Sequence, residues 1–111
     1  MIPYSIHITK AAERDVVNAS DYIDNVLKNP TAADHLLNEF EATVESLASF
    51  PCKFPLAHDD LLASLGIRFI PVKNYLILYL VDENTHVVQI IRFLYRKSNW
   101  ISVLKGGISI D

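Results

Sequence analysis

The chain has 111 residues, half of them apolar, and its formal net charge is −3 at pH 7. This is the size of one ordinary domain with enough apolar material for a single core, and it excludes a chain that is disordered throughout. A single cysteine excludes an internal disulfide framework. No apolar run is long enough to span a bilayer, and we see no signal peptide, which would begin with a charged segment followed by an apolar one. We therefore expect a cytoplasmic protein without a membrane segment. It should form one domain over residues 1–105, followed by a loose tail over residues 106–111.

The start of the chain predicts a strand followed by a helix. Residues 4–8 alternate apolar and polar side chains, as a half-buried strand does. Thr9 is suited to cap a helix. Apolar side chains then recur at steps of four and three residues from Ala12 to Val26 or Leu27, which is the spacing of one helix face.

A second helix follows after a short break. Pro30 disfavours helical backbone at Asn29, and Thr31 can cap the next helix. Its apolar positions recur at helical spacing from Leu36 to Phe50. Two helices joined by so short a turn are expected to form an antiparallel hairpin.

The last half of the chain predicts a meander of strands. Residues 51–65 read as a loop, and Gly66 marks its end. A two-residue turn separates the first two strands, with Asn74 suited to left-handed backbone. Residues 98–104 are expected to form a short closing helix. The predicted strands cover residues 67–72, 75–81 and 86–94, and the segment from residue 4 to 8 is free to join an edge of their sheet.

Charge divides the chain into an acidic and a basic part. Residues 1–65 hold four basic and ten acidic side chains, whereas residues 66–111 hold six basic and three acidic ones. An anionic partner is therefore expected to meet the C-terminal part. The alternative for the acidic part is a solvated surface that only keeps the molecule in solution.

Particular residues in this basic part resemble a known family. A glycine and an arginine open the first meander strand, the central strand is rich in tyrosine, and a basic cluster precedes a final aromatic residue. The residues that carry the resemblance are Gly66, Ile67, Arg68, Val72, 74–79, Val88, 90–97 and Trp100. In this order they resemble the RelE/ParE superfamily of toxins from bacterial type II toxin–antitoxin systems.

The resemblance implies both a fold and a partner. The fold is α+β, with a helical hairpin packed on a small, mainly antiparallel four-stranded sheet in the order strand, helix, helix and three strands. The implied function is growth inhibition within an addiction module of the kind that stabilises plasmids. A cognate antitoxin would neutralise the toxin in a hetero-oligomer, and no cofactor is implied.

The family contains two mechanisms. RelE-like members cut messenger RNA at the ribosome, which needs proton transfer and cations that neutralise the reacting phosphate. ParE-like members inhibit DNA gyrase and need no nuclease site. Here Leu76 stands where RelE-like nucleases carry an arginine, and Phe54 stands where some carry a glutamate. With a pI of about 5.7, these departures favour the ParE-like mechanism. An mRNA endonuclease remains the alternative, and an inactive member that only binds a partner is the third.

The resemblance also selects candidate site residues. If the chain is a nuclease, the catalytic residues are Arg92, Tyr95 and Arg96. For binding of a target or antitoxin, the candidates are Arg68, Lys73, Arg92, Arg96, Lys97 and Trp100.

Each candidate also has a structural interpretation. Arg68 can cover an apolar strand edge with its stem, and Trp100 can be a lid over the core. Arg92 can form an internal ion pair with a helix acid such as Glu39 or Glu45. Residues 95–97 can be a solvated strand end. The spacing of the four histidines matches no zinc site, so no metal is expected.

Overall fold

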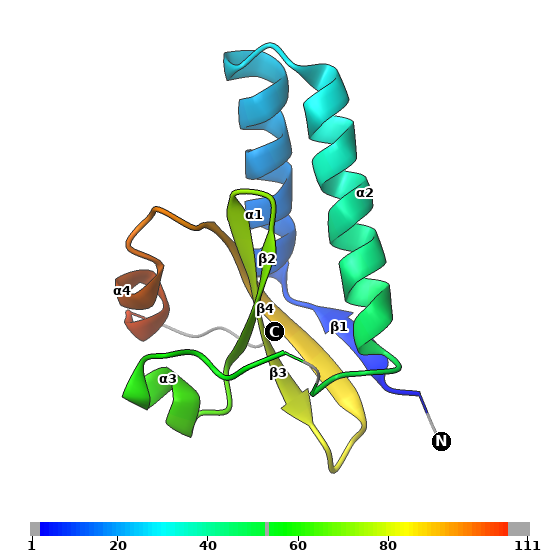
Figure 1. Ribbon diagram of the computed structural model, residues 1–111, viewed down its shortest axis with the longest axis vertical. Helices are drawn as coiled ribbons and strands as arrows, with labels where there is room; N and C mark the ends of the chain where they lie inside the picture. The colour runs from blue at the N-terminus through cyan, green and yellow to red at the C-terminus, as the bar shows by residue number, and fades with distance from the viewer. Residues whose placement is uncertain (1–2, 53, 107–111) are drawn as a thin grey trace.

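The computed structural model describes residues 3–52 and 54–106, and Figure 1 shows two long helices standing side by side above a small twisted sheet. The elements are β1 (Ser5–Ile8), α1 (Lys10–Asp21), a π-helical turn η1 (Tyr22–Val26), α2 (Pro30–Leu47), α3 (Asp60–Ser64), β2 (Arg68–Val72), β3 (Tyr75–Asp82), β4 (Val87–Tyr95) and α4 (Trp100–Lys105). The predicted α+β arrangement of a helical hairpin on a four-stranded sheet is confirmed.

The first helix begins where the sequence predicts. The Thr9 hydroxyl accepts a hydrogen bond from the Ala12 backbone N–H at 3.1 Å, which satisfies one of the free donors of the first turn. The same hydroxyl donates to the Ile91 carbonyl at 2.8 Å, so the cap also fixes α1 to β4. At its other end, α1 widens into η1, where the Leu27 N–H donates to the Tyr22 carbonyl at 3.1 Å.

The second helix starts two residues earlier than expected. Asn29, and not Thr31, is the N-cap, and its side chain accepts from the Ala32 N–H at 3.1 Å. Pro30 occupies the first helical position, where the missing N–H costs nothing because that donor would be free anyway. The non-helical backbone expected at Asn29 is confirmed, with φ −131° and ψ 75°.

The sheet has the order β1-β4-β3-β2. The meander strands pair antiparallel, and β1 joins the edge beside β4 in parallel, with Ser5 opposite Val87 and Ile8 opposite Ile90. A register shift between Leu78 and Tyr79 interrupts the pairing of β3 with β4. The sheet is therefore mainly antiparallel, as predicted.

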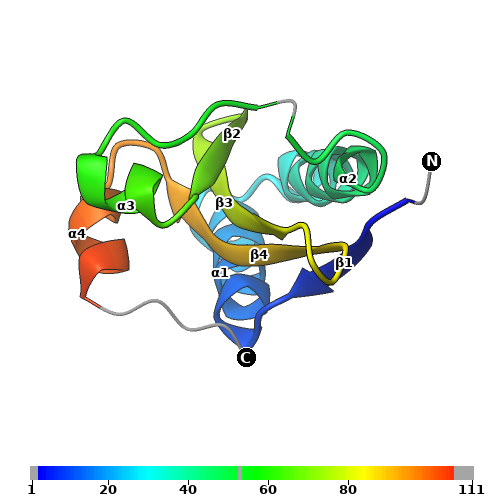
Figure 2. The ribbon, with the colours of Figure 1, turned by 90° about the horizontal axis from the view of Figure 1, so that it is seen from below.

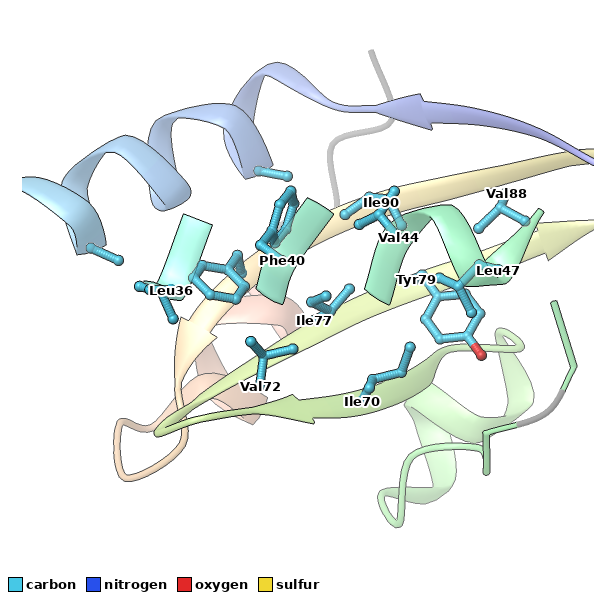
Figure 3. Packing of buried hydrophobic residues seen from close by; sticks show 13 residues of the cluster. Leu36, Phe40, Val44, Leu47, Ile70, Val72, Ile77, Tyr79, Val88 and Ile90 are labelled. Carbon is cyan, nitrogen blue, oxygen red and sulfur yellow. The ribbon is translucent and has the colours of Figure 1, made fainter. Parts of the chain in front are cut away.

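A first hydrophobic cluster fills the space between the sheet and the helical hairpin. Figure 3 shows Leu36, Phe40, Val44 and Leu47 of α2 facing side chains of the strands. This row has the helical spacing that predicted the hairpin. Tyr79 is fully buried in this cluster and donates its hydroxyl to the Pro51 carbonyl at 2.9 Å, so its polar atom is satisfied.

A second cluster covers the opposite face of the sheet. It contains Leu62 of α3 and Leu104 of α4 together with strand residues such as Ile91. Figure 2 shows α3 and α4 lying against each other on the side of the sheet away from α2. The Lys105 ammonium group joins the two helices through an ion pair with the Asp59 carboxylate at 2.7 Å.

Two local expectations are corrected here. Residues 51–65 were expected to form a loop, but they contain α3. The Asp59 carboxylate caps this helix by accepting hydrogen bonds from the N–H groups of Leu61 and Leu62. The buried Leu62 side chain also holds the helix against the core. In the turn between β2 and β3, the left-handed residue is Lys73, with φ 55°, and not Asn74. Gly66 ends the loop with φ 81°, as its position predicts.

The closing helix is confirmed, and Gly106 is its C-cap. The rest of the expected tail, 107–111, lies outside the described residues. Within residues 3–52 and 54–106, no helix has the length and apolar character that a membrane crossing requires.

Candidate functional site

The end of β4 forms an exposed basic segment. Tyr95, Arg96 and Lys97 are all exposed, and a tight turn follows in which the Ser98 N–H donates to the Tyr95 carbonyl at 3.0 Å. Across the part of the chain that the structure describes, no acidic group lies within ion-pair distance of Arg96 or Lys97. Both charges are therefore available to a partner.

The turn between β2 and β3 lies beside this segment. The Arg96 N–H donates to the Asn74 carbonyl at 2.8 Å, which brings the strand end against the turn. Lys73, the other residue of the turn, pairs with Glu39 of α2 at 3.3 Å, and both side chains are 51% exposed. An ion pair so open to water is weak, so Lys73 can exchange its partner at low cost. We call Lys73, Arg96 and Lys97 the cationic rim.

Arg92 is not part of the cationic rim. Its guanidinium group donates to both carboxylate oxygens of Asp15 on α1, at 2.6 and 2.9 Å, and one of these oxygens also accepts from the Phe93 N–H at 3.0 Å. The pair holds the pKa of Arg92 above its ordinary value, chiefly through the hydrogen bond to Asp15.

The sequence suggested an internal ion pair for Arg92 with Glu39 or Glu45, and the partner is Asp15 instead. β1 pairs with β4 only as far as Ile90, so the edge of β4 is open beyond that point. The first turns of α1 run past this edge and place Asp15 there. Helix pattern alone cannot reveal that placement.

Arg68 lies at the other end of its hairpin from the cationic rim. It is opposite Tyr79, while the rim lies beyond the pairing of Val72 with Tyr75. Its side chain is half-buried, and the guanidinium group donates to the Phe54 carbonyl at 2.7 Å. The structural interpretation of Arg68 as cover for a strand edge therefore fits its surroundings.

Trp100 is placed on the second cluster. Its ring is partly buried, and its centroid lies 6.5 Å from that of Phe69. This position fits the structural interpretation of Trp100 as a lid over the core. Leu76, which stands where RelE-like nucleases carry an arginine, is 5% exposed, between Leu94 and Pro71 in the sheet.

A groove with a volume of about 690 Å³ separates the end of the hairpin from the cationic rim. η1 and the start of α2 form one wall, and the β2–β3 turn and the end of β4 form the other. Its lining includes Tyr22, Ile23, Leu27, His35, Leu36, Lys73, Tyr75 and Tyr95. The groove cannot be predicted from local sequence patterns, because its walls come from segments about fifty residues apart. The large residues Tyr22 and Leu27 at a helix end are a sequence signal that could have indicated it, and both are exposed in the structure.

The four histidines, Cys52 and the acids form no group of three or more that could hold a metal ion within residues 3–52 and 54–106. Cys52 is exposed, and its thiol lies 3.9 Å from a carboxylate oxygen of Glu83.

Comparison with known proteins gives the family. Residues 6–100 match the model of the ParE toxin of the type II toxin–antitoxin system parDE. No curated protein matches the sequence. One similar solved structure is a chromosomal ParDE toxin–antitoxin system from Pseudomonas aeruginosa, with a TM-score of 0.68 and 18% identity over 86% of this chain and 98% of that one. Another is the toxin–antitoxin complex RelBE2 from Mycobacterium tuberculosis, with a TM-score of 0.59 and 22% identity over 86% of this chain and 100% of that one. The two structures share the fold, and the family match over residues 6–100 shows that this chain belongs to the ParE toxins of type II toxin–antitoxin systems, within the RelE/ParE superfamily.

Proposed function

We propose that this toxin arrests growth by binding DNA gyrase through the cationic rim, without cutting RNA. The observation that carries the proposal is the state of two positions, 92 and 76, at which a RelE-like nuclease would need a cation. Arg92 is held by Asp15, and Leu76 is buried in the sheet. A phosphorane intermediate needs cations that face the reacting phosphate, and neither position offers one.

The residues that are left fit binding better than cleavage. Arg96 and Lys97 are exposed and unpaired among the described residues, and Tyr95 is 43% exposed. The exposed Tyr95 ring can pack against a partner, as aromatic side chains at interfaces do. The cationic rim can therefore recognise an acidic surface, which is the chemistry that a protein target needs.

We also propose a cognate antitoxin as the neutralising partner. The family match supports this, and both similar structures are described as toxin–antitoxin systems or complexes. The antitoxin would form a hetero-oligomer with the toxin and mask the cationic rim. Co-expression with the neighbouring reading frame should yield a co-purifying complex and restore growth.

The decisive experiment combines two assays on the same toxin. The purified chain is added to a DNA supercoiling reaction with gyrase, and transcripts from cells expressing the chain alone are mapped by primer extension. We expect inhibition of supercoiling and no new RNA ends. Arg96→Ala should weaken the inhibition while the protein stays folded.

Other results would identify the alternatives. RNA ends at defined codon positions, lost in Arg96→Ala, would show a RelE-like mRNA endonuclease. Normal growth on expression of the chain alone would show an inactive member that only binds a partner. Either result would refute the gyrase proposal.

A further inference from the structure

A β-bulge interrupts β4 a few residues before the end that carries Arg96 and Lys97. Leu78 and Tyr79 are neighbours on β3, but they lie opposite Arg92 and Ile90, so one residue of β4 is extra between these two pairs. An extra residue in one strand of an antiparallel pair defines a bulge. Bulges bend the strand, increase its twist and direct side chains next to functional sites.

The bulge changes which side chains of β4 face the helical hairpin. Val88 and Ile90 both belong to the first cluster, as alternation along a strand requires. The next β4 residue of that cluster is Phe93, and not Arg92. Ile91, the extra residue, is fully buried in the second cluster on the opposite face. The apolar residues on the two sides of the bulge therefore follow two different alternations.

Thr9 holds this bulge from outside the pair of strands. It lies between β1 and α1 and is fully buried. Its hydroxyl donates to the Ile91 carbonyl at 2.8 Å, and its backbone N–H donates to the Ile90 carbonyl at 3.0 Å. Successive carbonyls of a regular strand point to opposite neighbours, whereas here both point to Thr9. A buried carbonyl that turns away from its strand pair needs another donor, and the Thr9 hydroxyl supplies it.

The strand end beyond the bulge makes contacts that depend on this alternation. The Phe93 N–H donates to the Asp15 carboxylate at 3.0 Å. Tyr95 lines the groove beside the hairpin end, so it faces the hairpin as Phe93 does. The Arg96 N–H donates to the β2–β3 turn at 2.8 Å. Moving the strand end by one residue would put Arg96 in the place of Tyr95 and turn its charge toward the hairpin.

We propose that Thr9 is a positioning residue of this toxin. By holding the bulge at Ile91, its hydroxyl fixes the direction in which Arg96 and Lys97 leave the sheet. Thr9 lies 82 residues before the carbonyl that it binds, and it is buried, so it acts through β4 and not by contact with a partner. The inference rests on the proposed function, because it treats the cationic rim as the surface that binds gyrase.

Two substitutions separate the Thr9 hydroxyl from the shape of the side chain. Thr9→Val keeps the branched shape and removes the hydroxyl, whereas Thr9→Ser keeps the hydroxyl. NMR measures amide hydrogen exchange at Phe93 and Arg96, and a supercoiling assay measures gyrase inhibition by the same preparations.

Thr9→Val should speed exchange of both amides about tenfold, which is the effect of leaving one buried carbonyl without a donor. Inhibition should weaken about threefold, because fewer molecules then present the cationic rim in its binding arrangement. Thr9→Ser should keep both exchange and inhibition within about twofold of the unchanged chain, because it retains the hydrogen bond.

Asp59→Ala is a control for loss of stability alone. It removes the N-cap of α3, which lies on the face of the sheet opposite the hairpin. Loss of a helix cap should lower the denaturation midpoint of Asp59→Ala and of Thr9→Val by comparable amounts. Exchange at Arg96 and inhibition of gyrase should nevertheless stay unchanged in Asp59→Ala.

A measurement on the unchanged chain does not depend on whether a variant folds. The Thr9 hydroxyl proton is buried and hydrogen-bonded, so it should exchange slowly enough with water to give its own NMR resonance. A Thr9 hydroxyl proton in fast exchange with water would contradict the proposed clamp.

Three further results would overturn the proposal. These are unchanged exchange at Arg96 in Thr9→Val, equal weakening of inhibition by Thr9→Ser and Thr9→Val, and equal weakening by Asp59→Ala and Thr9→Val. Absence of gyrase inhibition by the unchanged chain would instead refute the proposed function. The exchange rates need no target, so they would still decide whether Thr9 holds the strand end.

Discussion

Arg92 and Arg96 lie four residues apart in the chain, but their guanidinium groups have opposite surroundings. Arg92 lies within β4, where Asp15 of α1 binds it with two hydrogen bonds. Arg96 lies just past the strand end, where the Asn74 carbonyl binds its backbone N–H and no described residue binds its guanidinium group. The comparison teaches that the neighbouring element decides whether a charge stabilises the fold or remains available to a partner.

The strongest test of this comparison is Asp15→Ala. It leaves the Arg92 charge without its partner and the Phe93 N–H without its acceptor, at a site where the Asp15 side chain is 12% exposed. Breaking a largely buried pair in this way should lower the free energy of unfolding by about 3 kcal/mol. Denaturant unfolding measures the loss. The control is Glu41→Ala at an exposed position of α2, which should lower the free energy of unfolding by less than about 0.5 kcal/mol. Similar losses in both variants would contradict the role of Asp15 in stabilising the fold.

Alkaline titration tests the buried face of the same sheet. Burial is the main cause that raises the pKa of Tyr79 to about 12. The folded state thus favours the neutral phenol, so this contribution to stability is complete below the ordinary pKa of 10.0 and is lost as the pH rises toward 12. Phenolate absorbance should show an ionisation step near pH 12, and Tyr79→Phe should remove that step. A step that persists in Tyr79→Phe would refute this assignment.

Substitution of the cationic rim should affect function and leave the fold intact. Arg96→Ala removes an exposed charge, so the free energy of unfolding should change by less than about 0.5 kcal/mol. Inhibition of gyrase should weaken about tenfold, the usual cost of one interfacial charge. The concentration that halves supercoiling activity measures this effect. A large loss of stability would show that Arg96 has a hidden partner in the fold.

The smallest effect is expected at the ion pair between α3 and α4. The hydrogen bond from Lys105, with those from Leu62 and Leu61, holds the pKa of Asp59 below its ordinary value of 3.8, against the effect of desolvation. The ionised carboxylate therefore stabilises the fold above that pH, and the contribution disappears as the pH falls through the lowered pKa. Asp59→Asn should be slightly less stable at pH 7, and the difference should shrink as the pH falls below 3.8. A difference that stays constant with pH would exclude this explanation.

Local patterns in the sequence were sufficient to predict most of the helices and strands. The period of the apolar residues predicted α1 and α2, and Thr9 marked the first N-cap because a capping hydroxyl needs only its own next three residues. Alternation and turn residues predicted the meander. The misplaced start of α2 is an error of choice between adjacent caps, which local patterns resolve poorly. The helix α3 was missed because its five residues are too few to show a helical period.

The candidate site was predicted only in part. The sequence identified the exposed basic residues Arg96 and Lys97, because a charged run after an apolar strand has no core to enter. It could not separate them from Arg92 or Arg68, whose partners, Asp15 and Phe54, are distant in sequence. It also gave no indication of the groove, since Tyr22 and Tyr75 meet only once the hairpin is packed on the sheet.

The sequence by itself determined the type and order of the elements, and through the family resemblance it also indicated the toxin fold, because these depend on patterns within short stretches of chain. Only the tertiary structure decided which cations are free, because that depends on which carboxylate or carbonyl from another element lies within hydrogen-bond distance. The Asp15 carboxylate binds the guanidinium group of Arg92, whereas no such group binds the guanidinium group of Arg96 among the described residues. The proposed function depends on this difference.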